Sequence, residues 1–536
     1  DCAPRALRGP TPTVYPFIVN DPGEAAQAKR RLGAIALGHK TPPLVDSEPA
    51  AALRELERLL DEYAAADGLD GKRRTRLAGD ILAAAGKSGL ERACGLSPGM
   101  TQAEALTRVD AFLCDVKELA IRDGLHVLDD GELDALVRAL DGRFIEPGPA
   151  GAPSRGRPDV LPTGRNLFAL DPRAVPTPLA YENGARLAEA IVARYVEDHG
   201  DWPRAMVLDL WGSQTMRTGG EEFASALALL GVKPVWDHSS FRVTGFEIVP
   251  PMILNRPRVD VTIRISGLVR DVFPAQLAFF HAAVQRVARL SEDPHENPLR
   301  IKTGPYYRIF GAPEGAYGAG VASRIDAADW NTREELAESY VAASSTAYPG
   351  DGGGVAARAA FEEAVRDADC FLHVQDHRES DILSGLDYAE HEGGFAAAAE
   401  ALGNRDAAIY HADTSEPTLP RARTLTEEAG RVLHGRALSN RWIRGQMRHG
   451  FSGAAELAAT VDSAFAFAAT AGAIPSEGLE HLYDAYLADA SVASFLAREN
   501  GAALEAMRRR FREAIARSLW VPRRNDLSAL DGTVAQ

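Results

Sequence analysis

AMVLDLW, residues 205–211, is a short apolar run with the length and composition of a buried strand. A second strand pattern, VDVTIRI at 259–265, alternates apolar with polar residues. Shorter strand patterns occur at 370–374 and 407–410, and helical runs separate the strands. Strands that alternate with helices in this way predict an α/β layer.

Two stretches rich in glycine and proline divide the chain. EPGPAGAPSRGRP forms 146–158, and 346–354 contains YPGDGGG, so both are predicted to be linkers or long loops. Three units follow from these breaks. Residues 1–145 are a strand followed by a helical segment, 159–345 are an α/β domain, and 355–536 pass from α/β to mostly helical. The predicted fold class is multidomain α/β with mixed layers.

Composition narrows the class of protein. The 536 residues carry a net charge of −16, which argues against a nucleic-acid or anionic-membrane surface. The longest apolar runs are too short to span a bilayer, and no signal peptide opens the chain. The four cysteines form no CxxC pair, so a zinc ribbon or redox dithiol is not indicated. We expect a reduced, cytoplasmic enzyme, and a start at Asp1 rather than Met suggests a piece of a longer protein.

Two glycine patterns bear on nucleotide binding. AGKS at 85–88 resembles the end of a phosphate-binding loop, but Ile81 stands where the motif requires its first glycine. GAYGAG at 315–320 has no clear strand before it. Both patterns are more typical of turns or helix caps. We therefore predict no nucleotide site in this chain.

An acidic residue follows the first strand pattern. In YPFIVNDPGEAAQAKRR, residues 15–31, a strand runs into the turn NDPG and Glu24 falls in the first turn of the next helix. GHK at 38–40 follows, with His39 at its centre. In the alternative interpretation this is a capped helix, with Asp21 as the cap and Glu24 opposing the helix dipole.

The densest group of ionisable residues is HVQDHRESD, residues 373–381, at the end of a short strand. Imidazole and carboxylate groups suit a borderline divalent metal, and loops after strand ends often carry such sites. His411 in YHADTS and His449 in MRHGFSG also follow short apolar segments. A solvated polar loop and core or capping histidines are the alternatives.

Arginines lie in two further loops. LPTGRNLFALDPRAVPTP, residues 161–178, holds Arg165 and Arg173 between prolines, where each can receive a carboxylate through two hydrogen bonds. WGSQTMRTGGEE, residues 211–222, is a strand-to-helix turn that contains Arg217 and could meet an anion. A surface crossover and an ordinary helix start are the alternatives.

Taken in order, the motifs resemble a known family. The further segments LCDVKELAIRDGLHV, DHGDWPR, RVTGFEIVPP, RPRVDVTIRISGLVRDVFP, RIFGAPEGAYGAG, HEGGFAAA and MRHGFSGAAELAATVD strengthen the match. The chain as a whole resembles the family of the cobaltochelatase large subunit CobN and the magnesium chelatase H subunit. NDPGEA and TGRN favour the cobalt branch, whereas Lys40 and Asn255 depart from its usual pattern. Family members are more than twice as long, so the resemblance implies a C-terminal half.

The resemblance implies an ATP-dependent ligase of cobalamin biosynthesis. It would insert cobalt(II), as substrate metal, into hydrogenobyrinic acid a,c-diamide. The partner subunits CobS, an AAA+ ATPase, and CobT would supply the energy by hydrolysing ATP with its bound Mg. Metallation strips water from cobalt and removes protons from ring nitrogens, which suits carboxylate and imidazole groups. The implied roles are catalytic for Glu24 and His39; metal-handling for His373, Asp376, His377 and His411; and corrin-binding for Arg165, Arg173, Arg217 and His449.

Three alternatives remain open at this stage. A magnesium chelatase of the H type would act on protoporphyrin IX instead of a corrin. A non-catalytic tetrapyrrole-binding protein of the same fold would bind the ring but never metallate it. A metallohydrolase built on residues 373–381 is disfavoured, because no HExxH motif occurs.

Overall fold

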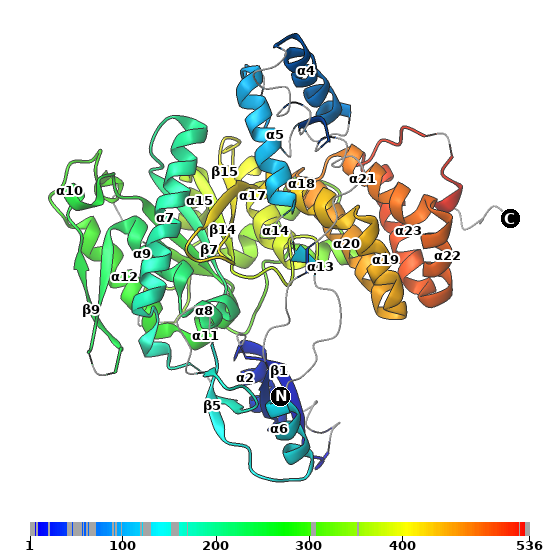
Figure 1. Ribbon diagram of the computed structural model, residues 1–536. Helices are drawn as coiled ribbons and strands as arrows, with labels where there is room; N and C mark the ends of the chain where they lie inside the picture. Colours follow the sequence, from blue (N-terminus) through cyan, green and yellow to red (C-terminus); the bar gives the residue numbers. More distant parts are fainter. Residues whose placement is uncertain are drawn as a thin grey trace.

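An eight-stranded sheet forms the centre of the computed structural model (Figure 1), with the strand order β13-β12-β11-β10-β7-β14-β15-β16. The inner strands from β11 to β15 are parallel, and β12, β13 and β16 join antiparallel at the two edges. The bounds are β7 Ala205–Leu210, β10 Asp260–Ile265, β11 Ile309–Gly311, β12 Thr346–Ala347, β13 Val355–Ala356, β14 Cys370–Gln375, β15 Ala408–Asp413 and β16 Arg421–Thr424.

The structure describes residues 6, 9–19, 22–39, 45–46, 56, 58–60, 63, 71–87, 91, 94–97, 99–117, 120–121, 130–151, 160–168, 170–238, 240–301, 307–350, 353–524 and 526–530.

Both faces of this sheet are covered, which explains why nearly all residues of its inner strands β7, β10, β11, β14 and β15 are buried. Side chains of successive strand residues point to opposite faces. Met206 and Leu208 accordingly join the core formed with α7, α9 and α12, whereas Val207 joins the core formed with α14, α15, α17 and α20. The helix bounds are α7 Pro178–His199, α9 Glu221–Leu230, α12 Pro274–Ala288, α14 Arg333–Ser344, α15 Arg358–Asp367, α17 Gly394–Ala401 and α20 Gly450–Thr470.

The predicted α/β class and the four strand patterns are confirmed, with one difference in β10. All six residues of β10 are buried, including the polar ones. The alternation therefore does not mark a solvent-facing side. Its polar residues face partners instead: Asp260 binds the Arg308 guanidinium through two hydrogen bonds of 2.5 and 2.8 Å.

The predicted boundary at 346–354 does not separate two sheets. β12 lies inside that stretch, and the strands on either side of it, from β7 to β12 and from β13 to β16, hydrogen-bond into one sheet. The two predicted domains, 159–345 and 355–536, therefore share a core layer. After β16 the described chain is helical, which confirms the predicted helical C-terminal region.

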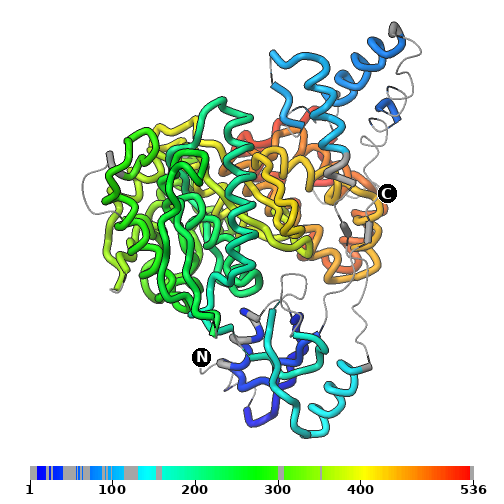
Figure 2. The backbone as a smooth tube through the Cα atoms, turned by 60° about the vertical axis from the view of Figure 1, so that its left-hand side comes forward, coloured from blue at the N-terminus to red at the C-terminus, as the bar shows by residue number. Residues whose placement is uncertain are grey.

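A smaller four-stranded sheet, β1-β2-β6-β5, lies at the end of the molecule where the N-terminus is found (Figures 1 and 2). Its strands β1 and β2 come from the start of the predicted N-terminal segment, whereas β5 and β6 lie beyond residue 145. β5 falls within the predicted linker 146–158. The elements are β1 Val14–Ile18, α2 Pro22–Leu32, β2 Ile35–His39, α6 Asp130–Leu140, β5 Pro147–Pro149 and β6 Asn166–Phe168.

Two helices of the N-terminal segment lie at the opposite end of the molecule, as Figure 2 shows. They are α4 (Gly71–Lys87) and α5 (Gln102–Lys117), and α5 packs against α18 (Leu425–Val432). Arg108 on α5 reaches Glu427 on α18 at 3.7 Å. Thr101 and Thr424 each stand three residues before a glutamate, which is the spacing of a capping box, and both boxes are formed, so each of these two helices begins where the sequence indicates.

The remaining elements connect these layers. They are β3 Val45–Asp46, β4 Ala120–Ile121, η3 Pro172–Ala174, α8 Gly212–Thr218, β8 Val232–Trp236, β9 Val243–Ile248, α10 Pro251–Leu254, α11 Gly267–Val272, η4 Pro298–Ile301, α13 Val321–Ala327, α16 Leu386–Tyr388, η5 Ala389–Gly393, η6 Leu433–Ala437, α19 Asn440–Arg448, α21 Ser476–Tyr483, η7 Asp484–Ala488, α22 Ala490–Glu499, α23 Gly501–Ala516 and η8 Ser528–Leu530.

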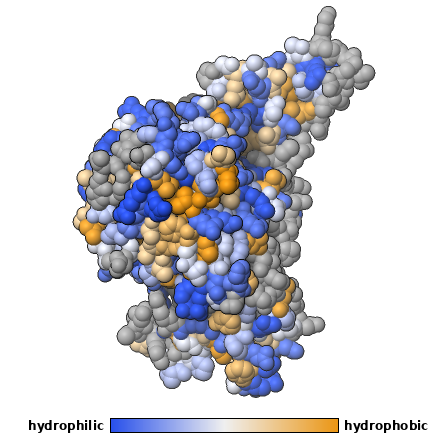
Figure 3. Space-filling view, turned by 90° about the vertical axis from the view of Figure 1, so that its left-hand side faces the viewer, coloured by the Kyte–Doolittle hydropathy of each residue, from blue (hydrophilic) through white to orange (hydrophobic). Residues whose placement is uncertain are grey.

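Figure 3 shows apolar side chains gathered on the face that carries β9 and α10, where Phe241, Met252 and Ile253 are exposed. Among the helices of the described residues, none combines the length and the apolar character needed to cross a bilayer.

Candidate functional site

The strand order reverses its direction of growth at β7. From β7 the chain adds β10 and β11 on one side, then returns to add β14 and β15 on the other. At such a switch point the loops leave in opposite directions, which opens a crevice at the carboxyl ends of the strands. The polar residues described below lie at these carboxyl ends.

Asp209 near the end of β7 is the centre of a buried polar cluster. Its Oδ2 accepts from Trp211 Nε1 at 2.6 Å and lies 2.8 Å from Nδ1 of His391 and 3.2 Å from Nδ1 of His373. Arg264 on β10 approaches its Oδ1 at 3.5 Å. Burial alone would raise the pKa of Asp209, but the surrounding histidines and Arg264 outweigh that effect and lower it. Asp209 is therefore a carboxylate inside the protein.

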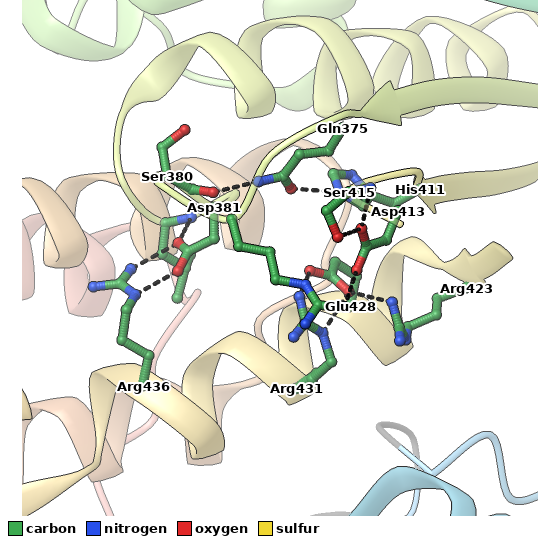
Figure 4. Close-up of polar contacts among 12 residues, drawn as sticks. Gln375, Ser380, Asp381, His411, Asp413, Ser415, Arg423, Glu428, Arg431 and Arg436 are labelled. Atoms are coloured by element: carbon green, nitrogen blue, oxygen red, sulfur yellow. Dashed lines mark hydrogen bonds and ion pairs between the residues drawn. The ribbon is translucent and has the colours of Figure 1, made fainter. Parts of the chain in front are cut away.

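His411 on β15 belongs to a second buried chain of hydrogen bonds (Figure 4). Gln375 donates through Nε2 to the backbone oxygens of His377, at 2.8 Å, and of Ser380. Because both acceptors fix the amide, Gln375 Oε1 faces Nε2 of His411 at 2.9 Å, while Glu392 Oε1 lies 2.8 Å from its Nδ1. Both ring nitrogens thus donate, and His411 is an imidazolium.

The electrostatics agree with this assignment. Burial on its own lowers the pKa of His411, but the charge and hydrogen bond of Glu392, with help from Glu428, raise it overall. A doubly protonated ring has no lone pair to offer a metal.

Arg217 and Asp376 form the third feature. The guanidinium on α8 binds the carboxylate through two hydrogen bonds, of 2.6 and 2.8 Å, and both side chains are buried. Behind them lies Glu222, fully buried, with Thr215 and Thr218 donating their hydroxyls to it. Burial raises the pKa of Glu222 to about 7. This carboxyl can therefore hold or release a proton near neutral pH.

Two adjoining cavities lie over these residues. The first, which we call the His373 cavity, has a volume of about 200 Å³. Its walls include Trp211, Gln214, Arg217, His373, Asp376, His377 and Tyr388. The second, the Arg431 cavity, has a volume of about 150 Å³. Its walls include Arg378, Asp381, Asp413, Arg431, Arg436 and Trp442. Both cavities share Gln375, His377, Ser380 and Ser384, so the loop after β14 forms their common wall.

His373 presents one nitrogen to the first cavity. Its Nδ1 is directed to Asp209, and its Nε2 has no hydrogen-bond partner within the described part of the chain. A carboxylate that holds Nδ1–H fixes the ring tautomer and leaves Nε2 as a base. Trp211 lies edge-on to this ring at 4.7 Å and also lines the cavity. The first cavity therefore combines a proton acceptor with aromatic walls.

A carboxylate binds the backbone N–H groups at the end of the glycine pattern 315–320. Glu390 Oε1 accepts from the backbone N–H groups of Ala319, at 2.7 Å, and Val321, at 3.2 Å, where α13 begins. These are the groups that would face a phosphate in a glycine-rich loop. AGK of the other pattern, residues 85–87, is the last turn of α4. Ser88 lies outside the described residues.

The structure brings most of the predicted metal-handling residues together. His373, Asp376 and His377 line one cavity, while His411 lies behind Gln375. Each has other partners: Asp209 for His373, Arg217 for Asp376, and the backbone N–H of Glu379, at 3.2 Å, for His377. No group of three or more His, Cys, Asp or Glu among the described residues has a metal-holding arrangement. The metal roles of His373, Asp376 and His377 stay predictions, whereas the doubly protonated ring of His411 does not fit its predicted role as a metal ligand.

The predicted corrin-binding residues are more dispersed. Arg217 lines the His373 cavity, but its guanidinium is already held by Asp376. Arg165 immediately precedes β6 in the small sheet, and exposed Arg173 pairs with Asp171 in η3. His449 is exposed where α19 meets α20.

The predicted catalytic pair belongs to the small sheet and its helix. Glu24 lies in α2, and α2 packs against α8, the helix that carries Gln214 and Arg217. Its side chain, and Asp21 as the alternative cap, lie outside the described residues. His39 is the last residue of β2, and its backbone oxygen accepts from Val19 at 2.8 Å.

Sequence reasoning missed Asp209, Trp211, Gln375 and Glu392. Asp209 is the lone acid within an apolar strand, which is a signal in itself because a buried charge requires partners. Glu392 follows His391 in HEGG, a segment that supported the family resemblance but to which the sequence assigned no site residue. The roles of Gln375 and Trp211 depend on residues more than a hundred positions away or on neighbouring strands, and no local pattern announces them.

Comparison with known proteins gives a consistent result. A family model described as CobN/magnesium chelatase matches residues 1–131 and 128–527. The aerobic cobaltochelatase protein CobN of Sinorhizobium is 39% identical over 98% of this chain and 53% of its own length. The H component of magnesium chelatase from Rhodobacter capsulatus is 31% identical over 99% of this chain and 47% of its own length.

A solved structure agrees with these relatives. The catalytic subunit of cobaltochelatase from Mycobacterium tuberculosis superposes with a TM-score of 0.90 at 34% identity. The match covers 99% of this chain and 55% of that one. The chain thus spans about half the length of the relatives that it matches.

Proposed function

The chain belongs to the CobN/magnesium chelatase family, and on that premise we propose that it carries tetrapyrrole-binding and metal-inserting groups of a cobaltochelatase large subunit. The proposed reaction places cobalt(II) in hydrogenobyrinic acid a,c-diamide. The observation that supports it best is the Asp209–His373 pair on the wall of an aromatic cavity, because metal insertion requires a base for the ring protons.

His373 is the proposed acceptor of a proton that leaves a ring nitrogen. Asp209 holds its Nδ1 and stabilises the cation that forms when Nε2 takes the proton, as a carboxylate–imidazole pair does in other enzymes. Trp211 and Tyr388 offer flat apolar surfaces to the macrocycle from the same wall. Glu24 on α2, next to α8, is proposed as a second base or as a group that relays the metal.

Two observations favour cobalt over magnesium. Identity to the cobaltochelatase protein of Sinorhizobium is 39%, against 31% to the magnesium-chelatase protein of Rhodobacter capsulatus. The cavity walls also present imidazole beside carboxylate, a ligand type that cobalt accepts more readily than magnesium.

The energy of insertion is proposed to come from partners, an AAA+ ATPase of the CobS type and a protein of the CobT type. Glu390 occupies the backbone N–H groups at the glycine-rich loop, which supports an ATP site on another chain. The loop after β14, shared by both cavities, is the element on which such a partner would act.

Titration of the chain with hydrogenobyrinic acid a,c-diamide, followed by the corrin absorption, tests the proposal against protoporphyrin IX. Tight binding of the corrin alone is the expected result. Preference for the porphyrin would transfer the proposal to a magnesium chelatase, and binding of neither ring by the folded chain would contradict a ring site in these residues.

Glu24→Gln separates a chelatase from a non-catalytic ring-binding protein. In a complete complex with the ATPase partners, the variant is expected to bind the corrin normally but to insert cobalt slowly, because a base is lost and the ring site is kept. Unchanged insertion rates would remove Glu24 from the mechanism.

A further inference from the structure

The Arg431 cavity is distinct from the His373 cavity in its chemistry. Arg378, Arg431 and Arg436 reach it from the β14 loop, α18 and η6. Asp381 and Asp413 also line it, and each faces a guanidinium: Arg436 binds Asp381 at 2.8 Å, and Arg378 lies 3.5 Å from Asp413. Figure 4 shows Asp381, Asp413, Arg431 and Arg436 arranged below Gln375.

Arg431 binds its ion-pair partner through two of its three guanidinium nitrogens. Its Nε and Nη2 hold Glu428 at 2.8 and 2.5 Å, and the side chain is 6% exposed. Its Nη1 has no hydrogen-bond acceptor among the residues that the structure describes. Arg431 lines the cavity, so this N–H group can donate to an acceptor that enters it, and a hydrogen bond between a guanidinium and a carboxylate is a strong one.

The surrounding charges do not cancel. The cations of the connected cluster are Arg378, Arg423, Arg431, Arg436 and the His411 imidazolium. The anions are Asp381, Asp413, Glu392 and Glu428. Among the described residues, five positive charges therefore stand against four negative ones in this largely buried region. Glu379 and Glu456 also line the cavity but are exposed, so water screens them.

Size limits what can complete this cluster. A volume of about 150 Å³ suits a short carboxylate arm such as acetate or propionate. The guanidinium of Arg431 can bind a carboxylate through hydrogen bonds. Trp442 also lines the cavity, with Arg436 stacked over its ring at 4.5 Å, and offers an apolar contact to the methylene groups of the arm. The loop after β14 lines both this cavity and the His373 cavity. A carboxylate arm in the Arg431 cavity would therefore come from a ring that lies against the His373 cavity.

We propose that the Arg431 cavity is a carboxylate subsite that receives one acid side arm of the tetrapyrrole. This inference rests on the proposed function, because it assumes a ring that lies against Trp211, His373 and Tyr388 of the neighbouring cavity. Arg431 is then a residue that determines specificity, favouring a macrocycle with a free carboxylate at that corner over one whose arm is amidated or esterified.

The test uses the double variant Glu428→Gln/Arg431→Gln in the full chain. Removing both partners avoids leaving Glu428 as a buried unpaired charge, and thermal unfolding confirms that the variant folds. Arg444→Gln, an exposed arginine on α19, is the matched control. The ligands are hydrogenobyrinic acid a,c-diamide and its fully methyl-esterified form, followed by corrin absorption.

The expected result is a Kd for the acid form that rises about 10- to 100-fold in the double variant and stays unchanged in the control, since hydrogen bonds to charged groups have that strength. The ester should bind equally to all three proteins. If the acid form binds the double variant as tightly as the parent chain, the subsite is wrong and the proposed function stands.

A second measurement covers the case in which the parent chain binds no ring. Propionate is titrated while the fluorescence of Trp442 is followed, with Trp442→Phe identifying its signal. A change that the double variant abolishes would support the carboxylate site even though the proposed function had failed. No change in the parent chain would overturn the site.

Discussion

Nδ1 of His411 lies 2.8 Å from Oε1 of Glu392, and both side chains are wholly shielded from solvent. β15 supplies the imidazole and the π-helical turn η5 supplies the carboxylate, 19 residues apart in the sequence. Because Gln375 accepts from the other ring nitrogen, the pair is an ion pair rather than a neutral hydrogen bond. A buried ion pair of this kind should contribute to the free energy of unfolding, and its contribution should depend on pH.

Glu392→Gln should lower the free energy of unfolding by about 3–5 kcal/mol at pH 6, because it leaves the His411 imidazolium without its anion. Urea unfolding measures the loss. The raised pKa of His411 sets its pH dependence: the stabilisation is complete below the unfolded value near 6.5 and declines as pH rises through the folded value. The gap between parent and variant should therefore narrow at alkaline pH. A gap that widened there would contradict the imidazolium.

Glu222→Gln should change how stability depends on pH. The carboxyl has a pKa raised by burial to about 7, so the folded protein holds its proton between pH 4.5 and 7 while the unfolded chain has lost it. Stability due to this group therefore falls as pH rises through that window, by up to about 3 kcal/mol. The variant should lack this decline in unfolding experiments at pH 5 and pH 8. Parallel curves for the two proteins would show that Glu222 is ionised throughout.

Asp209→Asn should reduce the rate of cobalt insertion by about 10²- to 10⁴-fold with little change in corrin Kd, because His373 loses the group that fixes its tautomer. Single-turnover insertion in the complete complex gives the rate, and corrin absorption gives the affinity. Asp260→Asn is the matched control, since Asp260 is equally buried but stands at the opposite, amino end of β10 and binds Arg308. Equal losses in both variants would point to destabilisation instead.

Gly184→Ala should destabilise the contact between α7 and α9. A Cβ at residue 184 would lie 2.4 Å from the Glu221 backbone oxygen and 2.7 Å from Ala224 Cβ, so the helices would have to separate. We expect a loss of about 1–3 kcal/mol in thermal unfolding. Gly79→Ala, on α4 with open space around its added Cβ, should instead stabilise by about 0.5–1 kcal/mol. Similar effects at both positions would refute the close approach.

Local sequence predicted the elements that local forces govern. AMVLDLW and VDVTIRI became β7 and β10, and Thr101 and Thr424 begin the helices that their capping boxes indicate. Strand formation and capping depend on residues within a few positions of one another, so the sequence displays them directly.

The sequence did not predict that the segments on either side of 346–354 form one sheet, because pairing between distant strands decides this. The glycine-rich break at 346–354 suggested separate domains, yet β12 within it joins β11 to an edge of the common sheet. A glycine-rich stretch shows that the chain can turn. It does not show whether the strands on either side pair with each other or with new partners.

The sequence by itself determined the family resemblance, the α/β class and the cluster of ionisable residues after β14. Only the tertiary structure decided what those residues do for one another. Asp209, His373 and His391 come from three segments separated by up to 182 positions, and the protonation of His411 depends on how Gln375 is turned by the loop beyond it. The charge state of a buried group depends on every partner within a few ångströms, and chain folding alone sets those distances.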